Sequence, residues 1–263
     1  MDLGIRGKVA FVAAASKGMG RACALGLATE GARVAMAART ASEVEAAAAD
    51  VARRTGGEAV GIAADLSRAE DVSRAMARTR AALGEVDILV ANVGGPPPGG
   101  FEQSSDEQWR AAFEQVHLSV VRLIREVLPH MRQRRWGRIL TIQSSSVKQP
   151  VDGLILSNGV RPGVAGFLKT LAGDVAKDGI TVNLVLPGRI ETDRFLEHQR
   201  ARAAAAGVSL EEQMRRGSAD IPMGRVGSPE EFANMLVFLA SERASYVTGT
   251  CIQVDGGLIK SVV

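Results

Sequence analysis

The stretch VAFVAAASKGMGRACALGLA, residues 9–28, decides the fold. It passes from a short apolar run to a glycine-containing turn and then to apolar residues at helical spacing, which predicts a strand, a turn and a helix. Gly18 and Gly20 let a ligand approach the backbone, and the first N–H groups of a helix are free to bind an anion such as a pyrophosphate. A glycine turn alone also fits an ordinary tight connection, so the surrounding βαβ unit carries the prediction.

Short apolar runs alternate with helical patterns along the rest of the chain, which predicts an α/β fold with about seven parallel strands and helices on both faces. Four helix starts have the pattern of a capping box. The apolar runs begin at Val9, Arg33, Ala59, Ile88, Arg138, Thr181 and Cys251, and the boxes pair Thr40 with Glu43, Ser67 with Glu70, Ser105 with Gln108 and Ser228 with Glu231. No repeat or linker divides the chain, so we expect one Rossmann-type domain over residues 1–263.

Composition excludes several classes of protein. A hydrophobic content of 46% with 23% charged residues excludes general disorder, and a net charge of +3 does not require a nucleic-acid partner. The basic run at residues 132–138 is typical of the end of a long helix. Cys23 and Cys251 lack metal-ligand spacing, so we expect no metal site. Because no signal peptide or membrane-spanning run is present, we expect a cytoplasmic protein that does not contact membranes.

Two segments stand apart from this alternation. GGPPPGG, residues 94–100, follows the predicted fourth strand, where an open α/β sheet keeps its ligand crevice. The charged, alanine-rich segment at about 193–221 follows the sixth strand. It is either a surface excursion or a lid over the substrate.

The chain resembles the short-chain dehydrogenase/reductase family, in particular its 3-oxoacyl-acyl-carrier-protein-reductase-like branch. The family's TGxxxGxG turn aligns with residues 13–20, where Ala13 and Ala14 replace the first Thr and Gly. Ordered motifs over nearly the whole chain carry this resemblance. It implies that the cofactor is bound by Ser16, Lys17, Gly18, Met19, Gly20, Arg39, Thr40, Asp65, Leu66, Asn92, Gly94, Pro187, Gly188, Ile190 and Thr192.

The end of the second strand indicates which dinucleotide is bound. In a βαβ fold an acidic residue there binds the ribose 2′-hydroxyl of NAD, whereas a cation accommodates the 2′-phosphate of NADP. Arg39 stands at this point and Lys17 lies within the phosphate turn. We therefore expect NADP(H) to be preferred over NAD(H).

The catalytic pattern of the family is only partly present. Family members reduce carbonyls with a serine, a tyrosine and a lysine, helped by an asparagine on the preceding helix. Ser144 aligns with the serine, but Ser157 and Arg161 stand at the positions of the tyrosine and the lysine. His117 takes the place of the asparagine, and the only tyrosine of the chain is the distant Tyr246.

These replacements change the chemistry of the site. An aliphatic hydroxyl is a much weaker acid than a phenol, so Ser157 does not simply inherit the role of the tyrosine. Arg161 can hold ribose hydroxyls, a carboxylate or an oxyanion, but it does not transfer a proton. His117 is the best remaining acid by its pKa, although a packed or half-exposed helical histidine is the favoured interpretation.

Three functions remain open from the sequence. The first is an NADP(H)-dependent oxidoreductase that moves hydride between nicotinamide and a carbonyl or alcohol, with Ser144, Ser157, Arg161 and His117 as candidate catalytic residues. The second is a catalytically inactive dinucleotide-binding sensor or partner subunit, and the third is non-redox chemistry such as dehydration in the same cleft. The resemblance further implies a homo-oligomer, a tetramer or a dimer, and a small-molecule or acyl substrate.

Overall fold

The computed structural model describes residues 1–262, and its centre is a seven-stranded parallel sheet with the order β3-β2-β1-β4-β5-β6-β7. β1 lies between β2 and β4, so the strand order reverses there and leaves a crevice at the carboxyl ends of the strands. The strands are β1 (Val9–Ala13), β2 (Arg33–Ala38), β3 (Ala59–Ala63), β4 (Ile88–Asn92), β5 (Gly137–Ile142), β6 (Ile180–Pro187) and β7 (Cys251–Val254). The predicted fold class is confirmed, because every predicted apolar run is a strand.

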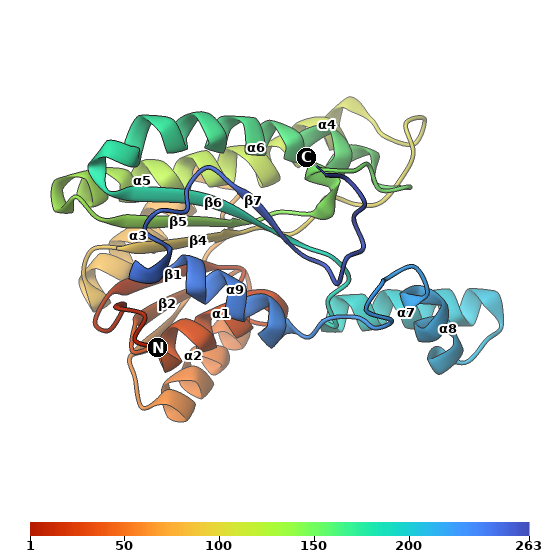
Figure 1. Cartoon of the computed structure of the whole chain (residues 1–263), viewed down its shortest axis with the longest axis horizontal. Helices are drawn as coiled ribbons and strands as arrows, with labels where there is room; N and C mark the ends of the chain where they lie inside the picture. The colour runs from red at the N-terminus through yellow and green to blue at the C-terminus, as the bar shows by residue number, and fades with distance from the viewer. Residues whose placement is uncertain (263) are drawn as a thin grey trace.

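Helices cover both faces of the sheet and bury a separate hydrophobic core on each (Figure 1). One face carries α1 (Gly18–Thr29), α2 (Ala41–Thr55) and α9 (Pro229–Leu239). The other carries α3 (Ala69–Leu83), α4 (Asp106–Phe113), α5 (Ser119–Arg134) and α6 (Ile155–Val175). Within residues 1–262 no helix has both the length and the apolar character needed to cross a membrane.

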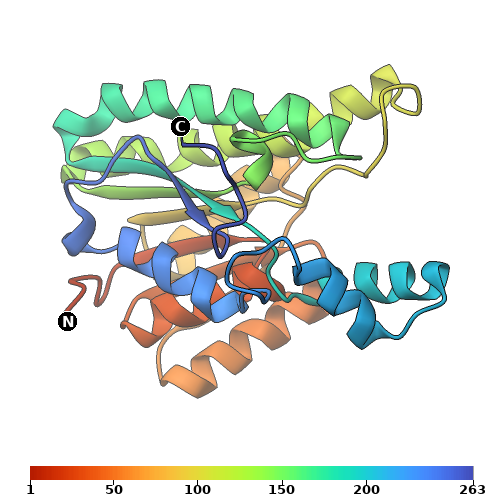
Figure 2. The same ribbon diagram turned by 45° about the vertical axis from the view of Figure 1, so that its right-hand side comes forward.

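Two further helices, α7 (Asp193–Ala206) and α8 (Leu210–Ser218), coincide with the predicted lid segment. They project from the side of the molecule where β6 runs into α7 (Figures 1 and 2). This is the edge formed by the carboxyl ends of the strands, where the crevice lies.

Two of the four predicted capping boxes form. Ser105 and Ser228 each accept the predicted backbone hydrogen bond at the start of α4 and α9. The prediction is wrong for Thr40, which precedes α2 without a side-chain cap, and for Ser67, because α3 begins only after Arg68. Ser67 instead donates its hydroxyl to a neighbouring carboxylate in the loop.

The basic run near residue 135 has a structural role. Its first arginines end α5, as predicted, whereas Arg138 is only 2% exposed within β5. The Arg138 guanidinium lies 4.4 Å from the ring centroid of Trp136, donates to the carbonyl oxygen of Ser241 and forms an ion pair with Glu242 at 3.5 Å. Because these partners satisfy its charge, Arg138 is not available to bind an external phosphate.

Candidate cofactor and active site

The turn between β1 and α1 provides a cradle for an anion. α1 begins at Gly18, and its N-cap residue Lys17 makes no side-chain cap, so the first N–H groups of the helix are free. A Cβ atom added to Gly20 would lie 2.2 Å from the carbonyl oxygen of Ala14. Only glycine therefore allows the helix to start this close to the strand, and the residues present fit a bound pyrophosphate.

Ala14 stands where the family turn has its first glycine, and it adopts a φ of +48°. A left-handed conformation costs an alanine about 1 kcal/mol. We therefore expect Ala14→Gly to stabilise the protein by about 1 kcal/mol, which raises Tm by about 2–4 °C. Thermal unfolding checks this prediction, with Ala46→Gly in the exposed middle of α2 as the control. The control is expected to lower stability by about 0.5–1 kcal/mol, and an equal loss at Ala14 would contradict the prediction.

A pocket of about 510 Å³ opens beside this turn. The predicted cofactor residues that line it are Ser16, Lys17, Arg39, Thr40, Asp65, Leu66, Asn92 and Gly94. They come from the ends of β1, β2 and β4 and from the loop after β3, which meet at the same edge of the parallel sheet. Eight of the fifteen predicted cofactor residues therefore line one cavity, which is large enough for a nucleoside.

The charges in the pocket are not all positive. Within residues 1–262, neither Lys17 nor Arg39 forms an ion pair. Glu43 also lines the cavity, with its carboxylate 3.4 Å from the hydroxyl of Ser16, and the sequence analysis missed it. Its position three residues after Thr40 suggested a capping box, and because that box does not form, the carboxylate faces the pocket instead.

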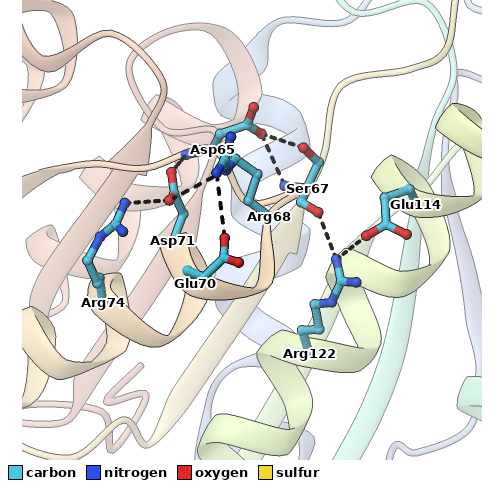
Figure 3. Close-up of polar contacts among 8 residues, drawn as sticks. All are labelled: Asp65, Ser67, Arg68, Glu70, Asp71, Arg74, Glu114 and Arg122. Atoms are coloured by element: carbon cyan, nitrogen blue, oxygen red, sulfur yellow. Dashed lines mark hydrogen bonds and ion pairs between the residues drawn. The ribbon is translucent and has the colours of Figure 1, made fainter.

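The side of the pocket formed by the loop after β3 is held by hydrogen bonds (Figure 3). Asp65 accepts hydrogen bonds from the backbone N–H of Ser67 at 3.1 Å and from its hydroxyl at 2.7 Å, and these bonds lower the pKa of Asp65. Arg122 of α5 bridges the carbonyl oxygen of Ser67 at 2.7 Å and the carboxylate of Glu114 at 2.5 Å. The loop after β3 is therefore fixed to the α4–α5 unit.

The predicted residues after β6 pack against the C-terminal strand. Gly188 donates its N–H to the carbonyl oxygen of Val254, and a Cβ atom on it would lie 2.6 Å from that of Asp255. Ile190 is buried and pairs with Gly227. Pro187 is the last residue of β6.

Thr192 connects the start of α7 to the turn between β1 and α1. Its hydroxyl caps α7 by accepting the N–H of Phe195 at 3.3 Å. Its methyl group lies 3.2 Å from the point where a Cβ atom on Gly18 would stand. The first turn of α7 is therefore placed directly against the cofactor cradle.

A hydrogen-bonded group lies where β5 meets α6. Ser157 and Arg161 share one face of α6, and the Arg161 Nε donates to the Ser157 Oγ at 3.1 Å. The Ser157 Oγ lies 3.1 Å from the Ser146 Oγ, and Arg161 Nη1 donates to the Gln143 Oε1 at 2.9 Å. Ser144 lies between these two partners in the chain, and its Oγ accepts the Ser146 N–H at 3.1 Å. The structure thus brings three of the four candidate catalytic residues together.

His117 lies apart from this group. It belongs to a π-helical turn, Glu114–Leu118, and its ring stacks on Phe113 with centroids 4.7 Å apart. Phe167 covers it at 6.0 Å, and its buried Nδ1 has no hydrogen-bond partner among residues 1–262. Burial lowers the pKa of the imidazole, which favours the neutral form. These contacts favour the packed histidine over the acid.

Tyr246, the only tyrosine of the chain, makes no contact with this group within residues 1–262. Its side chain is fully exposed in the loop before β7, far along the chain from Ser144. The sequence analysis also missed Gln143 and Ser146, because the motif gave no reason to single out the neighbours of the expected serine. Among residues 1–262 no group of three or more His, Cys, Asp or Glu side chains is arranged to hold a metal ion.

The doubly wound sheet, the glycine turn and the nucleoside-sized pocket define a dinucleotide-binding α/β protein of the Rossmann type. Residues 13–259 match a family model described as enoyl-(acyl carrier protein) reductase. The chain belongs to the short-chain dehydrogenase/reductase family.

Relatives and solved structures of similar length support this assignment. The 3-oxoacyl-[acyl-carrier-protein] reductase FabG of Escherichia coli (strain K12) is 36% identical over 257 residues, which cover 97% of this chain and 99% of the relative. The crystal structure of L-sorbose reductase from Gluconobacter frateurii, complexed with NADPH and L-sorbose, superposes with a TM-score of 0.96 at 35% identity over 100% of both chains. YwfH, described as an NADPH-dependent reductase involved in bacilysin biosynthesis, gives 0.91 at 30% identity, covering 97% of this chain and 99% of its own.

Proposed function

We propose that this chain is an NADPH-dependent oxidoreductase that transfers hydride between nicotinamide and a carbonyl carbon or the corresponding alcohol. The observation that carries the proposal is the hydrogen-bonded group of Ser144, Ser157 and Arg161, which lies at the same sheet edge as an anion cradle. The relatives named above are reductases, and two of the similar structures are described with NADPH.

We assign the cofactor to the cavity and the turn described above. The free N–H groups at the start of α1 would bind the pyrophosphate, and Lys17 and Arg39 would bind the 2′-phosphate of NADPH. When bound, NADPH supplies the hydride. Further contacts are assigned to Ser16, Gly18, Met19, Gly20, Thr40, Asp65, Leu66, Asn92, Gly94, Pro187, Gly188, Ile190 and Thr192. The segment at about 193–221 would close over the substrate within the single domain 1–263.

The chain's own residues account for the charge that develops on the carbonyl oxygen. Because the Ser144 Oγ already accepts the Ser146 N–H, its own hydrogen is free to be donated to the substrate oxygen. The buried Arg161 guanidinium makes this edge of the site positive and holds a negatively charged substrate group in place. The oxygen then takes its proton from water, relayed through the linked hydroxyls of Ser146 and Ser157.

Turnover and one substitution test this proposal. We expect the purified protein to consume NADPH in step with carbonyl reduction, and Ser144→Ala to lower kcat about 100-fold because one donor to the oxyanion is lost. NADPH affinity, measured by fluorescence titration, should not change. Ser145→Ala is the matched control, since the neighbouring Ser145 side chain makes no hydrogen bond within residues 1–262, and we expect its kcat to stay within about threefold.

Three outcomes would contradict the assignment. Full turnover by Ser144→Ala would remove Ser144 from the reaction. A second outcome is that the protein binds NADPH but neither reduces any carbonyl nor oxidises any alcohol with NADP. That result would favour a dinucleotide sensor or an inactive partner subunit. Product formation without a change in NADPH absorbance would indicate non-redox chemistry such as dehydration.

A further inference from the structure

No acidic side chain within residues 1–262 neutralises the charge of Arg161. Its side chain is 5% exposed, and its Nε and Nη1 donate only to the uncharged side chains of Ser157 and Gln143. Its Nη2 has no hydrogen bond and no carboxylate within ion-pair distance among residues 1–262. Burying a cation without a counterion costs free energy of folding. Such a cation is therefore expected where a bound anion can pair with it.

A second guanidinium borders the same place. A Cβ atom built on Gly95 would lie 3.4 Å from the Arg161 Nη2 and 3.9 Å from both terminal nitrogens of Arg194. Burial lowers the pKa of Arg161 to about 10, and the positive charge of Arg194 acts in the same direction. Two like charges this close repel each other, and an anion between them would remove that repulsion.

Several arginines near the lid are neutralised by carboxylates, whereas Arg194, Arg200 and Arg202 of α7 form no ion pair within residues 1–262. Arg189 pairs with Asp220, Arg225 pairs with Glu231, and Arg215 and Arg216 pair with Glu212. Within residues 1–262 Arg194 has no such partner, although it lies on α7 between two acidic residues of the chain. Its guanidinium points to Gly95 instead of folding back on the helix.

The position of Arg194 is tied to the cofactor cradle. It is the second residue of α7, whose first turn is capped by Thr192 and packed against Gly18 of the phosphate turn. Arg161 is tied to the candidate reaction site, because it is bonded to Gln143, the residue before Ser144. Arg194 thus adjoins the cradle, Arg161 adjoins the candidate reaction site, and both guanidinium groups border Gly95.

We propose that Arg161 and Arg194 form a carboxylate-binding subsite, and that the substrate is a small oxo acid or the matching hydroxy acid. This inference rests on the proposed function. Guanidinium groups bind a planar carboxylate through two parallel hydrogen bonds, which a single lysine does not provide. Arg161 is bonded to Gln143, the residue before Ser144, so we place the carboxylate and the reacting carbonyl in one short substrate such as a 2-oxo or 3-oxo acid.

The test compares each acid with its neutral ester. With saturating NADPH, we expect kcat/KM for 2-oxobutanoate or acetoacetate to exceed that for the corresponding methyl ester at least 100-fold. Arg194→Gln should raise KM for the acid about 100-fold, with kcat and the ester kinetics within about threefold. Arg200→Gln on the same exposed helix is the matched control and should leave the preference unchanged.

A binding measurement separates failure of this inference from failure of the proposed function. If neither acid nor ester is reduced, calorimetry of the NADPH-loaded protein with oxamate and ethyl oxamate decides the subsite, and the proposed function fails only if no other carbonyl is reduced either. Binding of oxamate alone, weakened at least tenfold by Arg194→Gln, would support the carboxylate subsite. The inference is overturned if acid and ester are turned over or bound equally, or if neither is bound. It is also overturned if the preference for the acid survives Arg194→Gln.

Discussion

We expect the double variant Lys17→Ala/Arg39→Ala to bind NADPH about 1,000-fold more weakly than the unchanged protein, with NADH affinity within about threefold. Both side chains line the 510 Å³ pocket, and neither forms an ion pair within residues 1–262. A hydrogen bond to a charged group contributes about 1.5–3 kcal/mol, so two contacts to the 2′-phosphate give about 3–6 kcal/mol. NADH has no such phosphate and loses none of this energy.

The carboxylate of Glu43 also affects which nucleotide is preferred. Its carboxylate faces the same pocket and would repel a 2′-phosphate, so the preference for NADPH depends on the two cations outweighing it. Removing both leaves a pocket with net negative charge, which favours a free 2′-hydroxyl. Fluorescence titration with both nucleotides measures the two affinities.

The control removes the same amount of positive charge elsewhere. Arg78 and Arg125 are exposed on α3 and α5 and form no ion pair within the described residues. We expect Arg78→Ala/Arg125→Ala to change both affinities by less than about threefold, because charges beyond a Debye length are screened. An equal loss of NADH and NADPH affinity in the Lys17→Ala/Arg39→Ala protein would show that these residues do not bind the 2′-phosphate.

The strands could be predicted from the sequence because a parallel sheet is buried on both faces. Its strands read as continuous or nearly continuous apolar runs, such as residues 9–13 and 184–187, which stand out against amphipathic helices. Helix caps were harder to predict because a cap needs local geometry as well as the right residues. Ser105 and Ser228 have that geometry, whereas Thr40 precedes a helix without bonding to it.

The candidate site was predictable only where one helix or one strand end carries it. Ser157 and Arg161 are four residues apart on a helix, so the sequence already places them on one face. Arg194 and Glu43 come from segments whose approach to the site depends on packing between elements far apart in the chain, and no local pattern marks them. His117 shows the converse, because a residue in the motif position is turned by the π-helical segment against Phe113 and Phe167.

Gly20→Ala is expected to destabilise the protein by about 2–3 kcal/mol and to abolish measurable NADPH binding. The added Cβ would lie 2.2 Å from the carbonyl oxygen of Ala14 and 3.0 Å from the Asn92 Nδ2. The Ala14 carbonyl belongs to the backbone and cannot rotate away as a side chain can. α1 would have to withdraw from β1, which moves its free N–H groups away from the pyrophosphate.

This requirement explains why the turn tolerates alanine at position 14 but keeps glycine at position 20. At Ala14 the extra methyl group costs only a left-handed φ, a local strain of about 1 kcal/mol, whereas at Gly20 it would fill space that the neighbouring backbone occupies. Gly173→Ala in α6 is the control, because a Cβ there meets nothing within 4 Å, and it should raise stability by about 0.5–1 kcal/mol. Thermal unfolding and NADPH titration of both variants measure the two effects. NADPH affinity retained by Gly20→Ala would mean that the cofactor is not bound at the start of α1.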